Sequence, residues 1–252
     1  MKTHSSNYWT NHFLKNSLIK RINWNIEPNL NDLERKKILK SLQAWQLGET
    51  SEGKHLLHAA EKYAISTNDN EYPAAVKLFI KEEQKHGNNL GKYLDLIGEA
   101  RIKKDWGDSL FRKIRYHNTN MEIWTLAVIT VESVAQIFYQ ALKDATQCKL
   151  LKQICTDILI DEADHIIFQK ERLYIIFSQK APFSKFIAYH AYSCFFFCTS
   201  LIVWLAHKKL FIAGKLTFSR YLIKMKCKYS KIAGKSVLYQ QERQQNISLI
   251  EV

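Results

Sequence analysis

Two short motifs in the sequence place a glutamate three residues before a histidine. They are Glu83-Gln84-Lys85-His86 and Glu162-Ala163-Asp164-His165. In an α-helix, residues i and i+3 lie on one face, so the glutamate and histidine of each motif can hold the same metal ion. A third ExxH triplet begins at Glu52, which shows that one such motif alone is weak support. The two motifs therefore predict a metal site only if further ligands lie at the same level.

Apolar residues recur at helical spacing in four long segments, which we expect to be helices at about 31–66, 72–99, 120–144 and 147–179. Eight Gly and three Pro in 252 residues are too few turn residues for an all-β chain. The basic stretch 101–120 is long enough for a crossover, with a short helix near 110–114. Two antiparallel hairpins joined by a long crossover predict an all-α, ferritin-like four-helix bundle.

The other two helices supply further carboxylates. Glu132 interrupts an otherwise apolar face of the third helix, where an unpaired carboxylate would be costly. The first helix places Glu49 and Glu52 on its inward stripe, between Trp45 and Leu56. One glutamate from each of two helices and one ExxH motif from each of the others form the ligand set of di-iron and di-manganese bundles.

The number of residues between a carboxylate and the expected turn indicates which carboxylates lie at the same height along the bundle axis. Glu132 and Glu162 are equally far from the turn that joins the third and fourth helices, so an antiparallel hairpin brings them together. For the turn between the first two helices, Glu52 matches the distance of Glu83 better than Glu49 does. We therefore favour Glu52, and Glu49 stays the alternative. The predicted metal ligands are Glu52, Glu83, His86, Glu132, Glu162 and His165.

At these residues the chain resembles the ferritin-like di-iron carboxylate superfamily, over about residues 31–179. The string Asp161-Glu162-Ala163-Asp164-His165 is similar to the DExxH form of bacterial multicomponent monooxygenases and of ribonucleotide reductase small subunits. In those proteins the Asp before the Glu hydrogen-bonds a ligand histidine of the opposite motif. The resemblance implies that Asp161 supports His86 in this way, with Glu82 as the counterpart for His165.

The resemblance also implies a function. Two iron ions, or manganese in their place, would activate dioxygen for hydroxylation, desaturation or a related oxidation of a small or lipid-like substrate. A separate reductase would supply electrons, because the sequence shows no flavin, nicotinamide or iron–sulfur motif. Two alternatives stay open: a non-catalytic ferritin-like protein that binds or handles iron, and a tRNA-modifying di-iron hydroxylase.

The remaining segments are an N-terminal arm, 1–30, and an extension, 180–252. Segment 186–206 has no charged residue and is long enough to span a membrane, although His190 and three hydroxyl side chains make a buried fifth helix an equal alternative. From residue 181 onward, eleven Lys plus Arg face two acids, so segment 186–235 could dock on anionic headgroups. RNA phosphates are the less favoured partner. Residues 1–16 lack a signal-peptide pattern, so we expect a cytoplasmic protein, either free or on the membrane surface.

Overall fold

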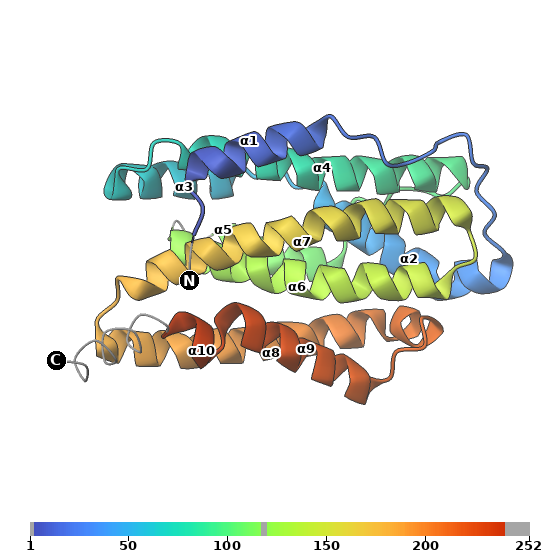
Figure 1. Ribbon diagram of the computed structural model, residues 1–252. Helices are drawn as coiled ribbons and strands as arrows, with labels where there is room; N and C mark the ends of the chain where they lie inside the picture. The colour runs from blue at the N-terminus through green and yellow to red at the C-terminus, as the bar shows by residue number, and fades with distance from the viewer. Residues whose placement is uncertain (1–2, 117–119, 240–252) are drawn as a thin grey trace.

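The computed structural model describes residues 3–116 and 120–239, which are helical apart from their connections (Figure 1). The helices are α1 (Ser6–Ser17), α2 (Asp32–Glu49), α3 (Lys54–Thr67), α4 (Tyr72–Leu96), α5 (Trp106–Tyr116), α6 (Met121–Ala145), α7 (Lys149–Ser178), α8 (Pro182–Ala213), α9 (Phe218–Ala233) and α10 (Lys235–Leu238). Within these ranges no residue is in a strand. The predicted all-α class is confirmed.

Four of the predicted elements build a bundle. The α6–α7 hairpin packs beside a second hairpin, in which α2 and α3 together precede α4, and α5 lies in the crossover between the hairpins (Figure 1). The core of the bundle is apolar and includes Leu42, Leu90, Phe138 and Ile158, all inaccessible to solvent. The ferritin-like arrangement predicted from the sequence is confirmed.

The first long helix differs from the prediction. A single helix over 31–66 was expected, but α2 ends at Glu49 and α3 begins only at Lys54. Between them Gly53 adopts a left-handed conformation with φ of 67°, which interrupts helical geometry and suits glycine. This break packs closely on α4, since a Cβ atom at Gly87 would lie 2.9 Å from the Thr50 side chain.

Two glycines beside this break should respond oppositely to alanine. A Cβ atom at Gly53 would lie 2.7 Å from Ile80 and face a left-handed backbone, so Gly53→Ala should destabilise the fold by about 1–2 kcal/mol or more. Gly48 lies inside α2 with nothing within 4 Å of its Cβ position, so Gly48→Ala should stabilise it by about 0.5–1 kcal/mol. Urea unfolding measures both changes, and the same sign for both would contradict this account of the break.

The segment expected to be an N-terminal arm contains a helix. Trp9 and Phe13 of α1 are buried on the bundle, and the Trp9 indole donates to the Glu171 carboxylate at 2.8 Å. Ser5 caps the helix by accepting from the Tyr8 amide. Helix α1 therefore packs on the bundle, alongside α4 in Figure 1.

The C-terminal extension forms a further layer of helices, with α8, α9 and α10 packed against the α6–α7 side of the bundle (Figure 1). Helix α8 spans Pro182–Ala213 and has a non-helical residue, His207, within it. One face of α8 is packed on the bundle and the other is exposed, so segment 186–206 is not the fully buried fifth helix of one alternative, and its entry into a membrane stays a prediction. By length and composition, both α6 and α8 could cross a membrane, and α6 is mostly buried as a core helix of the bundle.

Candidate metal centre

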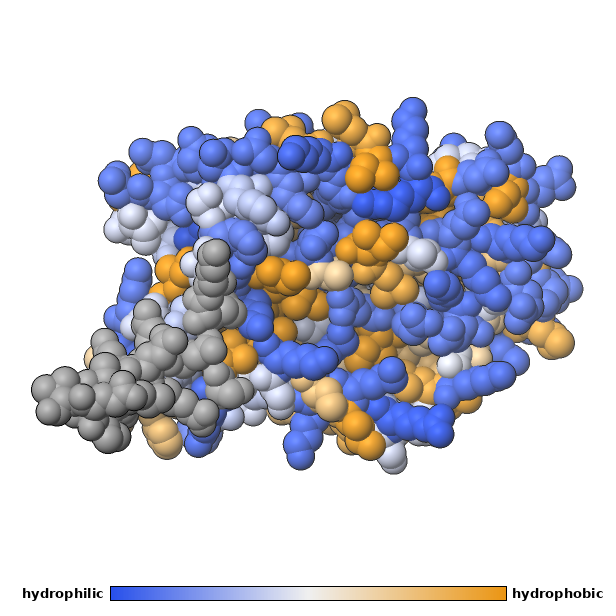
Figure 2. Space-filling model, viewed as in Figure 1, coloured by the Kyte–Doolittle hydropathy of each residue, from blue (hydrophilic) through white to orange (hydrophobic). Residues whose placement is uncertain are grey.

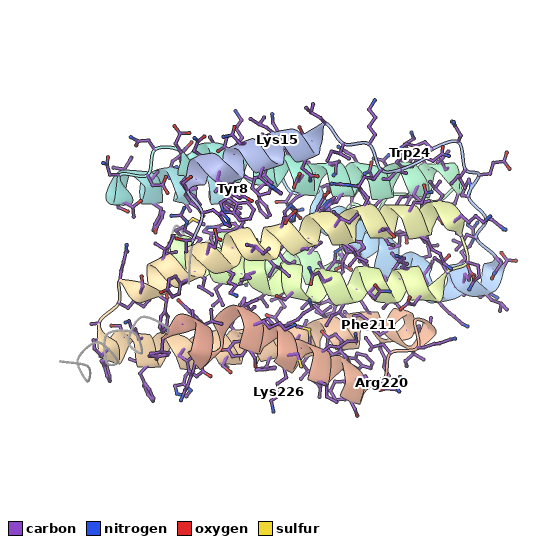
Figure 3. All side chains as sticks on the ribbon, in the orientation of Figure 1. Tyr8, Lys15, Trp24, Phe211, Arg220 and Lys226 are labelled. Carbon is purple, nitrogen blue, oxygen red and sulfur yellow. The ribbon has the colours of Figure 1, made fainter. Side chains whose placement is uncertain are left out.

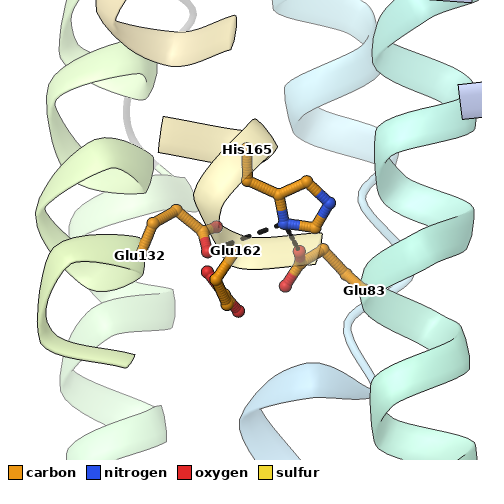
Figure 4. A group of neighbouring side chains, drawn as sticks. All are labelled: Glu83, Glu132, Glu162 and His165. Carbon is orange, nitrogen blue, oxygen red and sulfur yellow. Dashed lines mark ion pairs between the residues drawn. The ribbon is translucent and has the colours of Figure 1, made fainter. Parts of the chain in front are cut away.

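Carboxylates and imidazoles from four helices meet in the middle of the bundle, and Figure 4 shows four of these side chains converging. Glu83 and His86 lie one turn apart on α4, and Glu162 and His165 lie one turn apart on α7. Both histidines and Glu162 are inaccessible to solvent. The complete cluster is Glu49 at the end of α2, Glu83 and His86 on α4, Glu132 on α6, and Glu162 and His165 on α7.

The donor atoms of the cluster form two overlapping groups. One contains Glu83, Glu132, Glu162 and His165, and the other contains Glu49, Glu83 and His86, with the donor atoms of each group within 4.8 Å of one another. Glu83 belongs to both groups, and the Glu162 Oε1 atom lies 3.9 Å from His86 Nδ1. Both carboxylates therefore lie between the two donor groups.

Many of these donor atoms have no hydrogen-bond partner. Among the described residues, the buried atoms without one include Glu83 Oε1, His86 Nδ1, His165 Nδ1 and both carboxylate oxygens of Glu162. His165 Nδ1 does approach Glu83 Oε1 to 2.8 Å, but without hydrogen-bond geometry. Since unsatisfied buried polar groups are costly, a cluster of them aimed at one point fits a pair of cations.

The titration behaviour of the cluster agrees with this reading. Burial, together with the charge of Glu132, raises the pKa of Glu162 well above its usual range, and burial beside Glu83 does the same for Glu49. Burial also opposes ionisation of Glu132, but the neighbouring Glu162 and the imidazoles of His165 and His86 outweigh it and lower the pKa of Glu132. Protons thus neutralise part of the cluster, and divalent cations that bind it would displace them.

Each histidine contacts a buried carboxylate through the ring nitrogen that faces away from the cluster. Asp161 lies 2.9 Å from His86 Nε2, and Glu82 lies 2.9 Å from His165 Nε2. A carboxylate can only accept, so the Nε2–H of each imidazole donates. The Nδ1 atom of each ring faces the cluster, where it can ligate a metal when it carries no proton. The surrounding carboxylates raise the pKa of His165 well above 6.5, so a metal bound there would displace a proton from this ring. The contacts of Asp161 and Glu82 with the histidines are the two that the resemblance implied.

Helix α1 adds a residue that sequence reasoning missed. The Asn16 side-chain amide donates to Glu82 at 2.5 Å and to Asp161 at 2.8 Å, so it joins the two carboxylates that hold the histidines. Arg21 and Lys85 also bind Asp161. The only sequence signal for Asn16 is its position seven residues after Trp9, on the buried face of α1.

The structure corrects the preference for Glu52. Its side chain is 72% exposed and pairs with Lys54, whereas Glu49 is buried and its carboxylate accepts from the Tyr139 hydroxyl at 2.6 Å. Spacing favoured Glu52 because residue counting assumed one continuous helix, and the break after Glu49 invalidates that count. Tyr139 is packed in the core, and its hydroxyl positions Glu49.

An apolar cavity of about 850 Å³ opens beside the cluster. Glu49, Glu83 and Glu132 lie in its wall, together with side chains of α2, α5, α6 and α8. The apolar part of the lining includes Trp45, Phe79, Ile80, Val128, Val131 and Val203. The site therefore has room for a substrate next to the carboxylates.

His207, in the cavity wall, makes stability depend on pH. Burial lowers its pKa to about 4 from 6.5, and Nδ1 lies 3.0 Å from the Ser41 hydroxyl. Between these pH values the unfolded chain binds a proton that the folded chain does not, so the free energy of unfolding falls as pH falls, by up to about 3 kcal/mol. His207→Gln should flatten this dependence in urea unfolding of metal-free protein, and His58→Gln, at an exposed position, should not. Parallel curves for the parent and His207→Gln would contradict the assignment.

No protein-family model and no curated protein sequence matches the chain. Among solved structures it is similar to variants of an R2-like ligand-binding oxidase. One variant with an aerobically reconstituted Mn/Fe cofactor superposes with a TM-score of 0.62 at 15% identity, over 92% of this chain and 94% of that chain. A second such variant gives 0.61 at 14% identity, over 92% and 95%. The chain therefore has the ferritin-like helical fold of the R2-like ligand-binding oxidases.

Proposed function

We propose that the protein is a di-metal oxidase that binds two iron ions, or manganese with iron, and uses dioxygen to hydroxylate, desaturate or otherwise oxidise a small or lipid-like substrate. The observation that carries the proposal is the cluster of buried donors, unpartnered at five atoms, beside an apolar cavity. The similar solved structures, with Mn/Fe cofactors, support it. We also propose that the protein acts in the cytoplasm.

In this proposal the two donor groups each hold one metal. Glu49 and His86 serve one ion, Glu132 and His165 serve the other, and Glu83 and Glu162 lie between them. Carboxylate and imidazole ligands suit iron and manganese. When bound, such a pair supplies the electrons and open coordination positions that dioxygen reduction needs.

The chain's own residues prepare this site. Asp161 and Glu82 fix the tautomers of the two histidines, and the Tyr139 hydroxyl holds one oxygen of Glu49. The cavity wall at Val128 and Val131 limits water around Glu132 and offers contacts to an apolar substrate. Electrons for repeated turnover would come from an external reductase.

Oxygen uptake tests the proposal. Protein loaded anaerobically with Fe(II), or with Mn(II) and Fe(II), should consume dioxygen in proportion to chain concentration when air is admitted, and the Glu132→Ala variant should not. Glu52→Ala is the matched control, since the same substitution at this exposed position should leave uptake unchanged. Metal binding without oxygen consumption would favour the non-catalytic, iron-handling alternative.

A further inference from the structure

The apolarity of α8 is not explained by burial in this chain. The most apolar 18-residue window of α8 has a mean hydropathy of 1.6, yet only 33% of it is buried. The corresponding window of α6 has a mean hydropathy of 1.4 and is 67% buried, as a core helix should be. Helix α8 therefore has more apolar surface than the bundle buries.

The unused apolar surface lies on one face. Positions three or four residues apart project from the same side of a helix, and such positions on α8 carry exposed apolar or thiol side chains. They are Phe183, Phe186, Ile187, Cys194, Cys198, Leu201 and Leu205, and we call them the α8 stripe. Phe183 is 75% exposed and Leu205 is 65% exposed. No charged residue interrupts segment 186–206.

The end of α8 and the helices that follow it carry many cations. Residues 182–239 contain nine Lys and one Arg and no Asp or Glu. Eight of these cations are exposed: Lys208, Lys209, Lys215, Arg220, Lys224, Lys226, Lys231 and Lys235. Figure 3 shows Lys226 on the outer side of this layer, with Phe211 on the side toward the bundle. Hydrophobic (orange) and hydrophilic (blue) residues alternate along the lower edge of the molecule in Figure 2, where this layer lies.

We propose that the α8–α9 hairpin docks on a lipid bilayer with anionic headgroups, with the α8 stripe against the acyl chains and the exposed cations of this hairpin on the headgroups. An apolar helix face combined with cations and no acids is the composition of helices that lie in the membrane interface. The opposite face of α8, at Thr199 and Val203, lines the cavity of the candidate metal centre. One helix thus separates that cavity from the proposed lipid surface.

Charge favours a bilayer over the other occupants. A second copy packed symmetrically on the α8 stripe would bring two surfaces of eight exposed cations together, and their repulsion would oppose the dimer. RNA would satisfy the cations but would leave the apolar stripe in water. An anionic bilayer would cover the apolar stripe and also pair with the cations. This inference does not depend on the proposed oxidase activity.

Vesicle co-sedimentation of the full chain tests the docking. We expect binding to phosphatidylcholine vesicles that contain phosphatidylglycerol and much weaker binding to phosphatidylcholine alone. Binding should weaken with salt, because the Debye length falls from about 10 Å at 0.1 M to about 3 Å at 1 M ionic strength. Equal binding to both kinds of vesicle, or no binding to either, would overturn the proposal.

A matched pair of double variants locates the surface. Phe186→Glu with Leu205→Glu puts two charges into the α8 stripe, and Leu14→Glu with Ile65→Glu adds the same charge at exposed apolar positions of α1 and α3. We expect at least about a ten-fold loss of partitioning for the first pair, because it exposes carboxylates to the acyl region, and less than about a three-fold loss for the second. Thermal unfolding verifies that both fold. Equal losses would overturn the location.

The native thiols give an independent readout. In a Cys227→Ser background, anionic vesicles should slow the reaction of Cys194 and Cys198 with a polyethylene glycol maleimide at least about ten-fold, because acyl chains exclude the reagent. Unchanged labelling in the presence of bound vesicles would contradict docking through this face.

A dimer in solution that the α8 double variant abolishes would assign the stripe to self-association. Tighter binding to an unstructured RNA than to the vesicles would assign the cations to nucleic acid. Either result overturns the proposal.

Discussion

Replacing Glu162 with leucine is expected to raise stability without metal and to lower it with metal. Both Glu162 oxygens are buried without a hydrogen-bond partner. Leucine of similar volume removes that unsatisfied group, so the metal-free variant should be more stable than the parent by about 1–3 kcal/mol. With metal at about a thousand times its dissociation constant, the parent gains about 4.1 kcal/mol, and a variant that cannot bind gains nothing. The order of stabilities should therefore reverse.

Thermal unfolding with a chelator and with Fe(II) or Mn(II) under anaerobic conditions measures this reversal. Glu52→Leu is the matched control, because Glu52 is an exposed carboxylate that does not reach the cluster. It should change stability little in either condition. A Glu162→Leu variant that is less stable than the parent in both conditions would assign Glu162 a structural role and contradict the metal site.

The second large effect is expected at Asp161. Asparagine there removes the carboxylate that holds the His86 tautomer, so metal affinity should fall by about 10–100-fold. Burial opposes ionisation of Asp161, but hydrogen bonds from His86, Lys85 and Asn16 outweigh it and lower the pKa of Asp161. The acceptor is therefore charged at neutral pH, and an amide does not replace it.

Asp157→Asn separates this role from simple charge pairing. Asp157 is also buried and also pairs with Arg21 and Lys85, but His86 binds Asp161. Competition with a chelator of known affinity should show a large loss of metal binding for Asp161→Asn and a small one for Asp157→Asn. Equal losses would mean that the cations around Asp161, and not its hold on His86, determine the affinity.

The sequence carried enough information for the bundle and for most of the cluster. Helical periodicity predicts the two hairpins, and the burial cost of a lone carboxylate marks Glu132. Glu132 and Glu162 lie together in the structure, as spacing suggested, and Glu83 lies beside them. These features depend on local patterns and on counting residues along unbroken helices.

The features that the sequence did not predict depend on irregular geometry or on distant contacts. Choosing Glu49 requires knowing that the chain leaves helical geometry before Gly53. Asn16 reaches Asp161 across 145 residues of sequence, and no periodic pattern links them. For α8, hydropathy reveals the apolar helix but not which half of its surface the bundle covers. Tertiary packing decides all three.

Metal content per chain tests the central claim most directly. Elemental analysis should be made on protein purified from cells supplied with iron and manganese, beside the Glu132→Ala and Glu162→Ala variants and the Glu52→Ala control. The cluster predicts about two metal ions per chain in the parent and the control, and clearly fewer in the other two variants. Absence of bound metal from all four proteins, or equal metal content in all of them, would contradict a metal centre at this cluster.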